Sequence, residues 1–236
     1  MTRTFHHSAA LWADHPDLVA GVLHADGLDA VTDSGPRVAA YTGIARERLA
    51  GVGTESELGE IQAWRRAFAA MGLKPTQYRC ASESLLRRLR KEGELPRIHP
   101  LVDLCNAVSV AYAIPVAAID ASRVAWPLQV RHAEGDETYE TFGGTVEHPQ
   151  PGEVTFADAG GRSHARRWTN RQSGYSAVGP GTTEVLIVAE ALHDTAAQDV
   201  PKLIAALGDE LRSLWGAEPR TGLLTPAAPR FELPGS

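Results

Sequence analysis

The sequence predicts an α+β fold, a single domain in which helices pack on a mostly antiparallel β-sheet. Apolar residues recur at intervals of three and four up to Tyr112, which is typical of helices. From about residue 124 to residue 190, short apolar runs alternate with turn residues, which is typical of antiparallel strands. Because no Gly/Ser-rich linker separates the two halves, we expect them to share one core. The predicted domain covers residues 1–216, and the Pro-rich tail 217–236 is expected to be extended or partly disordered.

The first half begins with a predicted strand and continues with four predicted helices. The strand lies in "DLVAGVLHADGL" and ends at Gly27. Thr54 and Glu57 form a capping-box pattern at the start of the second helix. The last helix is apolar almost all round, which predicts burial on every side, and Pro115 follows it. The four expected helices cover residues 36–50, 54–71, 82–92 and 100–112.

The second half consists of two predicted hairpins, a central strand and a closing helix. The first hairpin is predicted from "PLQVRHA" and "ETYETFGG", which flank the turn signal "EGD". The second is predicted from "GEVTFADAGGRSHARRW". The run "TTEVLIVAEAL" is apolar enough for the middle of a sheet. The final segment "DVPKLIAALGDELRSLWG" predicts an amphipathic helix with Pro201 in its first turn.

Composition excludes some classes of function. Of the 236 residues, 43% are hydrophobic and 22% are charged, as in an ordinary globular protein. Because no run of ~18 apolar residues and no secretion signal is found, we expect a cytoplasmic protein that does not enter a membrane. The net charge of −6 argues against wrapping around nucleic acid by bulk electrostatics. Cys80 and Cys105 lack metal-type spacing, and we expect no metal and no organic cofactor.

The signatures of common catalytic sites are missing from the sequence. It contains no Gly-x-Ser-x-Gly, no His-Glu-x-x-His, no Walker loop and no dinucleotide-binding glycine motif. His6 and His7 are expected to be too flexible for a site, and the other histidines are scattered without metal spacing. Candidate site residues must therefore be sought among polar groups in unusual places.

Two of these places are predicted helices. Asp103 and Asn106 lie one turn apart in the most apolar helix, where each either bonds to nearby loop backbone or lines a pocket. Arg79 precedes a helix that carries Glu83. This pair forms either a structural ion pair, or a site in which the guanidinium offers a fork of donors to a carboxylate or phosphate.

The third place is the segment "RRWTNRQSG", directly after a predicted strand. A solvated strand end seldom needs a tryptophan, an asparagine, arginines and a glutamine together, so we interpret the segment as a recognition loop. Glu190 is the one acid at the end of the apolar strand "VLIVAE". We expect its carboxylate to face the same pocket as this loop.

Several segments, taken in order, resemble the B3/B4 domain. That domain is the editing module of the phenylalanyl-tRNA synthetase β subunit, and it also occurs as free-standing bacterial proteins. The matching segments are "KPTQYR", "LVDLCNAVS", "LQVRHAEGDETYETFGG", "GEVTFAD" and "TEVLIVAE", and the resemblance covers roughly residues 17–215. It implies the fold of that module and an activity on mischarged tRNA. The expected partner is the acceptor end of tRNA with its amino acid.

The resemblance also implies roles for individual residues. Asn106, in "DLCN", would stand beside substrate and water, and Glu190 would read the amino-acid side chain or bind the amino group. Arginines would hold the terminal phosphates, and Trp168 would stack on an unpaired base. The residues expected to bind substrate are Arg79, Glu83, Arg131, Trp168, Asn170 and Arg171.

Three departures from the family pattern keep more than one function open. Ala117 stands where the synthetase module has a histidine, and Cys105 stands where it has a threonine. The bulky "RRWTNRQSG" replaces a loop of small residues. One hypothesis is a trans-editing deacylase that cleaves the aminoacyl ester with a positioned water. The alternative is a non-catalytic module that binds tRNA, an amino acid or an aminoacyl metabolite. A hydrolase of another small ester or amide is a third, weaker option.

Overall fold

The computed structural model describes residues 3–234. The first half contains β1 (Thr4–His7), α1 (Ala9–Asp14), β2 (Val19–Ala25), α2 (Gly35–Ala50), the 3₁₀ helix η1 (Glu55–Glu57), α3 (Gly59–Ala70), α4 (Ala81–Glu92) and α5 (Pro100–Tyr112). The middle contains β3 (Val116–Asp120), η2 (Ala121–Arg123), β4 (Leu128–His132), β5 (Tyr139–Glu140), β6 (Val146–Glu147), β7 (Val154–Asp158), β8 (Ser163–Arg166) and β9 (Arg171–Gln172). The chain then forms β10 (Val185–Ala191), α6 (Ala196–Trp215), β11 (Arg220–Leu224) and β12 (Arg230–Glu232).

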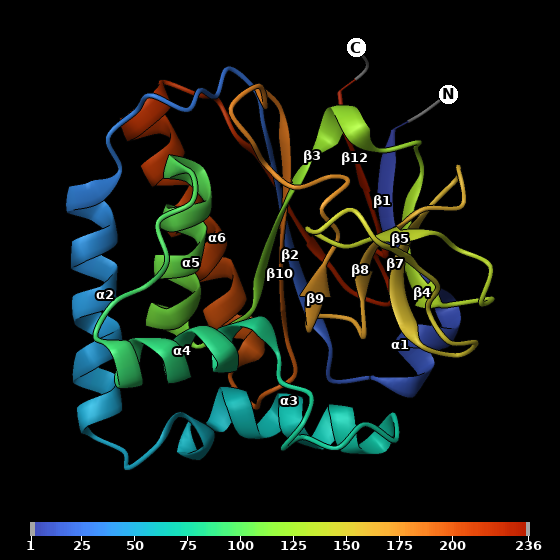
Figure 1. The fold of residues 1–236 in the computed structure, drawn as a ribbon, viewed down its shortest axis with the longest axis horizontal. Helices are drawn as coiled ribbons and strands as arrows, with labels where there is room; N and C mark the ends of the chain where they lie inside the picture. Colours follow the sequence, from blue (N-terminus) through green and yellow to red (C-terminus); the bar gives the residue numbers. More distant parts are fainter. Residues whose placement is uncertain (1–2, 235–236) are drawn as a thin grey trace.

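The strands form two main sheets, with the long helices gathered to one side (Figure 1). One sheet has the order β12-β1-β4-β7-β8-β9 and the other the order β11-β2-β10-β3, while β5 and β6 form a separate pair. Neighbouring strands of the described chain pair antiparallel, with β1 and β4 as the parallel exception. The predicted α+β class and the mostly antiparallel pairing are confirmed.

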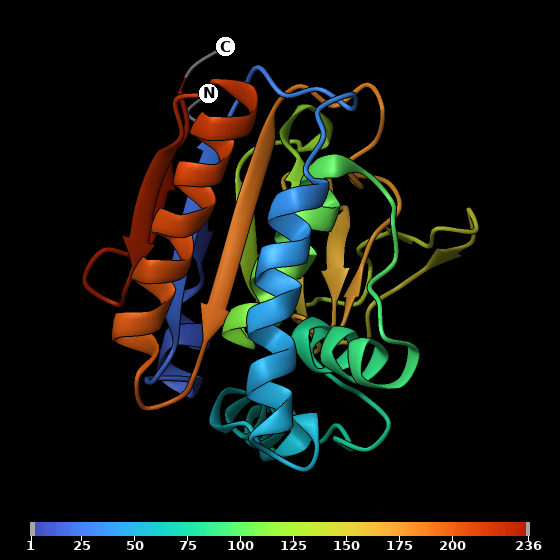
Figure 2. The ribbon, with the colours of Figure 1, turned by 90° about the vertical axis from the view of Figure 1, so that its left-hand side faces the viewer.

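Helices α5 and α6 pack on the four-stranded sheet, and α2 packs against α5 (Figure 2). In α6 the buried leucines Leu203, Leu207 and Leu211 recur every four residues, so one face of the helix is apolar. This face approaches β2 closely at Gly21, where any Cβ would collide with Ile204. Amphipathicity in the sequence therefore dictates which face of the sheet the helix covers.

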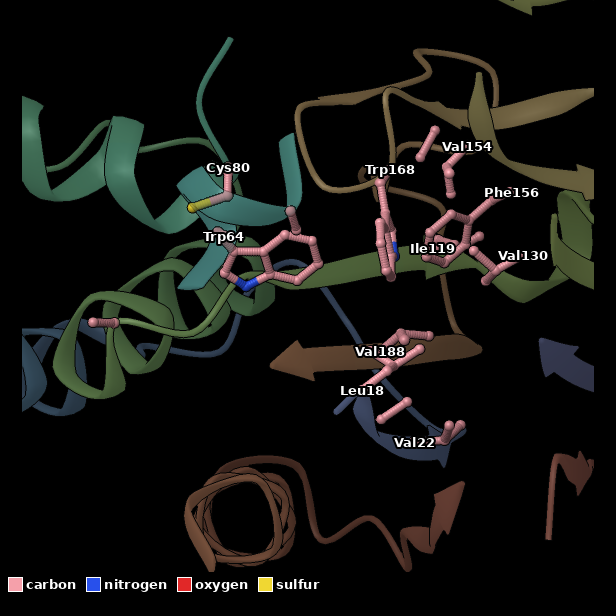
Figure 3. Packing of buried hydrophobic residues seen from close by; sticks show 14 of the residues in the cluster. Leu18, Val22, Trp64, Cys80, Ile119, Val130, Val154, Phe156, Trp168 and Val188 are labelled. Atoms are coloured by element: carbon pink, nitrogen blue, oxygen red, sulfur yellow. The ribbon is translucent and has the colours of Figure 1, made fainter. Parts of the chain in front are cut away.

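A hydrophobic core fills the space between the two sheets (Figure 3). Val130 and Phe156 reach it from the six-stranded sheet, and Val22 and Val188 reach it from the four-stranded sheet. Trp64 of α3 closes one end of this core. The two halves of the sequence thus share a core, as their lack of a linker predicts.

Local sequence signals are confirmed at several helix ends. The Thr54–Glu57 capping box forms, although it caps η1 rather than α3. Gly93 ends α4 at a φ of 81°, a conformation that glycine adopts without strain. Asp103 Oδ1 accepts the backbone N–H of Ile98 at 2.8 Å, so this buried carboxylate stabilises the start of α5. Asp103 therefore bonds to nearby backbone, and it also lines a pocket of about 230 Å³ between α2 and the segment before α5.

The predicted "EGD" hairpin is wrong. Strand β4 pairs with β1 and β7, whereas β5 pairs with β6. The reason is Glu137, which is buried and accepts the backbone N–H groups of Glu134 and Gly135, each at 3.0 Å. Its carboxylate folds the loop onto itself instead of letting the chain reverse into a hairpin.

The described part of the tail is extended, one of the two expected states, and it joins the two main sheets. Strand β11 adds to the four-stranded sheet beside β2, and β12 adds to the six-stranded sheet beside β1. Leu224, Phe231 and Leu233 are buried. The prolines lie before, between and after the strands, so they do not remove ladder hydrogen bonds within them. Among the helices of residues 3–234, none combines the length and apolar character needed to cross a membrane.

Candidate functional site

A small cavity lies where β3, β9 and β10 meet the start of α4, and its volume is about 60 Å³. Apolar residues of β3, β7, β8 and β10 form much of its wall. Its polar lining residues are Thr169, Asn170, Arg171, Gln172 and Glu190. The structure therefore brings together the segment "RRWTNRQSG" and Glu190, which lie apart in the sequence.

Glu190 provides the carboxylate of this cavity. It lies on β10, in the middle of the four-stranded sheet, and its side chain is 2% exposed. Its Oε1 accepts a hydrogen bond from Trp168 Nε1 at 2.9 Å and, with the proton on Nε2, from His7 at 2.7 Å. A buried carboxylate requires such donors to offset its lost hydration. Within residues 3–234, Oε2 accepts no hydrogen bond, which leaves this oxygen for a ligand.

His7 is a site residue that we expected to be too flexible, and this expectation is wrong. Strand β1 is held on both sides by β4 and β12, and the His7 side chain is fully buried. The sequence carries no local signal of this role, because Glu190 lies 183 residues away. A polar residue in a short N-terminal strand offers the only hint, and it becomes meaningful once the pairing of β1 is known.

Trp168 lies beside Glu190. It is fully buried, and its ring packs edge-on against Trp64 with centroids 4.9 Å apart (Figure 3). The ring of His15 also lies near it, with centroids 4.8 Å apart. Trp168 nevertheless lines the cavity, so a role in holding a base stays a prediction. Its structural contribution is the indole N–H that it donates to Glu190.

The backbone before Trp168 is held in an uncommon conformation. Arg167 and Trp168 have φ values of 48° and 58°, a region that non-glycine residues seldom occupy. Arg166 and Glu153 hold this turn with two parallel hydrogen bonds of 2.9 Å, and Glu153 also accepts the N–H of Arg167 at 2.9 Å. Such a conformation persists only where its surroundings enforce it, which is common at functional sites.

The rest of the loop is fastened to the elements on either side. Asn170 Nδ2 donates to the Arg79 carbonyl at 2.7 Å, and Gln172 Nε2 donates to the Ala118 carbonyl at 2.7 Å. These two amides line the cavity and join the loop to the start of α4 and to β3. The cavity wall is therefore fixed by side chain–backbone hydrogen bonds rather than left mobile.

Arg79 and Glu83 form an ion pair beside the cavity. Glu83 Oε1 is 3.1 Å from Arg65 Nη1 and 3.5 Å from Arg79 Nε. Glu83 is buried, and burial raises the pKa of its carboxyl above the ordinary value, although the two arginines oppose this rise. Arg79 also donates to the Thr76 carbonyl at 2.8 Å. Neither side chain lines the cavity, so a direct role in substrate binding stays a prediction.

The other two predicted arginines differ in their distance from the cavity. Arg171 lines the cavity and is partly exposed, with its guanidinium 3.1 Å from Glu147 and over the ring of Tyr139. Arg131 lies on β4, outside the lining, and pairs with the buried Glu137 at 2.6 Å. The structure thus places Arg171, but not Arg131, at the cavity.

Asn106 is half-buried on α5 and is not among the residues that line the cavity. Ala117, where the family pattern has a histidine, does line it, one strand away from Glu190. Cys105 is buried in the helix core, and burial raises the pKa of its thiol to about 12. The cavity lining contains two ionisable side chains, Arg171 and Glu190.

Outside the cavity, hydrogen bonds link a serine, a histidine and an aspartate in a chain. His164 contacts Ser176 Oγ through Nδ1 at 2.7 Å and Asp158 Oδ2 through Nε2 at 3.0 Å. All three are buried and none lines the cavity of Glu190. Asp158 also accepts the N–H groups of Gly160 and Arg162, each at 2.9 Å. We therefore assign this trio to the β7–β8 turn and not to catalysis.

Residues 3–234 contain no group of three or more His, Cys, Asp or Glu side chains gathered as a metal site would require. The chemistry that the cavity offers is that of hydrogen bonding. The carboxylate of Glu190 and the amides of Asn170 and Gln172 line a small space with apolar walls.

Comparisons with known proteins show which family the sequence of this chain matches. The sequence model of the B3/4 domain matches residues 63–203, more than half of the chain, and every residue lining the cavity falls within this range. A solved N-terminal fragment of the phenylalanyl-tRNA synthetase β subunit from Pyrococcus horikoshii is similar, with a TM-score of 0.49 and 10% identity. The match covers 93% of this chain and 51% of that fragment, so the chain spans about half the fragment's length. The search of curated proteins found no match.

Proposed function

Because the chain belongs to the B3/4 domain family, we propose that it hydrolyses the ester of a mischarged aminoacyl-tRNA, with the amino-acid side chain held in the cavity at Glu190. The observation that carries this proposal is the buried carboxylate in a small, otherwise mostly apolar cavity. Oε1 of Glu190 is occupied by His7 and Trp168, and Oε2 is available to an amino group or a hydroxyl.

The size of the cavity favours a small substrate group. A volume of about 60 Å³ holds a few heavy atoms and excludes an aromatic side chain unless the walls move. Ala117 and the neighbouring residues of β3 form part of this wall. Selectivity would then rest on size and on the hydrogen bond to Glu190, since an unpaired buried carboxylate oxygen penalises ligands without a donor.

The chemical step needs little more than a positioned water, because an aminoacyl ester is already activated. The water oxygen bonds to the ester carbon, the bond from that carbon to the ribose oxygen breaks, and the ribose oxygen takes up the proton that the water loses. Asn106 would orient the water or the carbonyl from α5, and Arg79 and Arg171 would contact the terminal phosphates. Orientation and electrostatics then supply the rate.

A second function, binding without turnover, is favoured by one observation. The cavity lining contains neither a histidine nor a cysteine, and Ala117 leaves no general base at the position of the family's histidine. In that case the same cavity would retain an amino acid or the charged end of a tRNA.

The test is deacylation of a full panel of correctly and incorrectly charged tRNAs at catalytic protein concentration. We expect turnover of one mischarged species, reduced at least about tenfold in N106A and in E190Q, as for loss of a single charged or orienting hydrogen bond. E184Q is a matched control, because Glu184 pairs with His24 at the same 2.7 Å and lies outside the cavity. Retention of tRNA without turnover would support the binding function instead.

A further inference from the structure

A second, larger cavity lies next to His7. The imidazole of His7 bonds to Glu190, and His7 also lines a space of about 370 Å³ between β1, α1, β4 and the turn before β12. Small-molecule sites in proteins usually have volumes from ~300 Å³ upward, so this space is of ligand size. Apart from Gln129, its lining residues lie outside residues 63–203, so most of the cavity is built by segments beyond the matched family domain.

The floor of this second cavity is a row of three polar residues on neighbouring strands. His6 is in register with Gln129 on one side and with Arg230 on the other. Residues in register across a sheet point to the same face, so the three side chains stand next to one another. Trp12 of α1 and the prolines Pro226 and Pro229 complete the wall. In Figure 2 the dark red turn before β12 lies on the same side of the molecule as the blue strand β1.

The charge of the lining is positive or neutral. Arg230 is exposed and no aspartate or glutamate is among the lining residues. Arginine and the indole of Trp12 can only donate hydrogen bonds, and the Gln129 amide and the imidazoles can donate as well. The cavity therefore offers donors from several directions with no carboxylate to compete for them.

Unpaired nitrogens gather around this cavity. The described chain contains nine buried side-chain nitrogens or oxygens without a hydrogen-bond partner. Three of them, His6 Nδ1, His7 Nδ1 and Trp12 Nε1, belong to residues of the lining, and these atoms are themselves closed off from solvent. His7 and Trp12 are each more than nine-tenths buried. Leaving a buried polar atom unpaired is destabilising, so proteins seldom retain several in one place without a use.

We propose that this second cavity binds the oxyanion group of a small molecule, a carboxylate or a phosphate, at the row formed by Arg230, His6 and Gln129. Arg230 supplies the positive charge. Burial and the neighbouring Arg230 lower the pKa of His6, so its imidazole acts as a neutral donor, as does the amide of Gln129. Binding here does not require turnover at Glu190. Neighbouring residues of a strand point to opposite faces, so the row of His6 faces away from His7, the residue of β1 that bonds to Glu190.

The test is calorimetric titration of the full chain with two probes, inorganic phosphate and acetate. We expect saturable binding of at least one probe, and R230Q should weaken it at least about tenfold, as for the loss of one charge-assisted contact. R220Q is the matched control, because Arg220 is also an exposed arginine on a C-terminal strand but lies outside this cavity. Preference for phosphate or for acetate identifies which oxyanion the site takes.

Two further variants separate this proposal from the proposed function and from misfolding. W12F removes the indole donor while keeping an aromatic ring, and it should also weaken binding. E190Q should bind the probe as the unaltered protein does, whether or not deacylation is observed. Absence of binding by either probe at millimolar concentration would overturn the proposal, as would equal weakening by R230Q and R220Q.

Discussion

The imidazole of His7 and the carboxylate of Glu190 are 2.7 Å apart and both are buried, although 183 residues separate them in the chain. This contact joins β1 of the six-stranded sheet to β10 of the four-stranded sheet. It therefore fixes the distance between the sheets at the point where the cavity opens. Stability and site geometry depend on the same hydrogen bond.

A direct comparison between two histidine–glutamate pairs tests this dependence. His24 and Glu184 are also 2.7 Å apart, but Glu184 is 24% exposed whereas Glu190 is 2% exposed. We expect H7A to lower the free energy of unfolding by about 3 kcal/mol and H24A by about 1 kcal/mol, because only H7A strands a fully buried carboxylate. Urea denaturation measures both values. An equal or smaller effect of H7A would contradict the importance of this contact.

Acid should destabilise the protein through Glu153. Burial by itself would raise the pKa of this carboxyl, but the hydrogen bonds and charge of Arg166 outweigh burial and hold the pKa below its ordinary value. A carboxyl with a lower pKa in the folded state stabilises the protein above its unfolded pKa of about 4.3, and this contribution is lost as the pH falls through the folded pKa. The free energy of unfolding should therefore decrease once the pH is lowered past about 4.5.

The variant E153Q isolates this contribution. Glutamine cannot titrate and loses the charge that pairs with Arg166, so E153Q should be less stable at pH 7 and should show a shallower decline in acid. Denaturant unfolding at several pH values gives both quantities. A decline as steep as in the unaltered protein would show that other carboxyls are responsible.

The two cysteines should be unreactive in the folded protein. Burial raises the pKa of each thiol to about 12, so almost no thiolate exists at neutral pH. A thiol-specific chromogenic reagent should label neither residue in the native state and both in denaturant. Rapid labelling of the native protein would mean that Cys80 or Cys105 is more accessible than its burial indicates.

Phe231 tests whether the tail is part of the fold. It is buried on β12 and contacts the backbone of β11 at Gly222. Truncating a buried phenylalanine costs about 3–5 kcal/mol, so F231A should be strongly destabilised. Phe142 is 75% exposed, and F142A should change the free energy of unfolding by no more than about 0.5 kcal/mol. Similar stabilities of the two variants would mean that the tail is dispensable.

Much of the fold could be predicted because its signals are local. Capping residues, glycines after helices and the spacing of apolar residues locate α2, α4, α5 and α6 to within a few residues. Strand pairing is not local. The parallel pairing of β1 with β4 joins segments more than 120 residues apart, and a buried acid such as Glu137 changes a predicted hairpin into a loop.

The candidate site likewise has features that local sequence signals predict and features that depend on tertiary contacts. The unusual polar content of "RRWTNRQSG" and the single acid in "VLIVAE" are local signals, and they correctly predict two walls of the cavity. The role of His7 and the burial of Trp168 could not be predicted, because each depends on a tertiary contact with Glu190. The indole of Trp168 bonds to this carboxylate, and its expected contact with a nucleic-acid base stays a prediction.

The most direct test of the proposed function is the initial rate of deacylation of each mischarged tRNA by the unaltered protein and by E190Q. The account predicts that one mischarged species, with a small amino-acid side chain that carries a hydrogen-bond donor, is hydrolysed at catalytic protein concentration. It further predicts that E190Q lowers this rate at least about tenfold, while E184Q does not change it. Equal rates for the unaltered protein and E190Q, or no turnover of any species, would contradict a hydrolase that selects its substrate at Glu190.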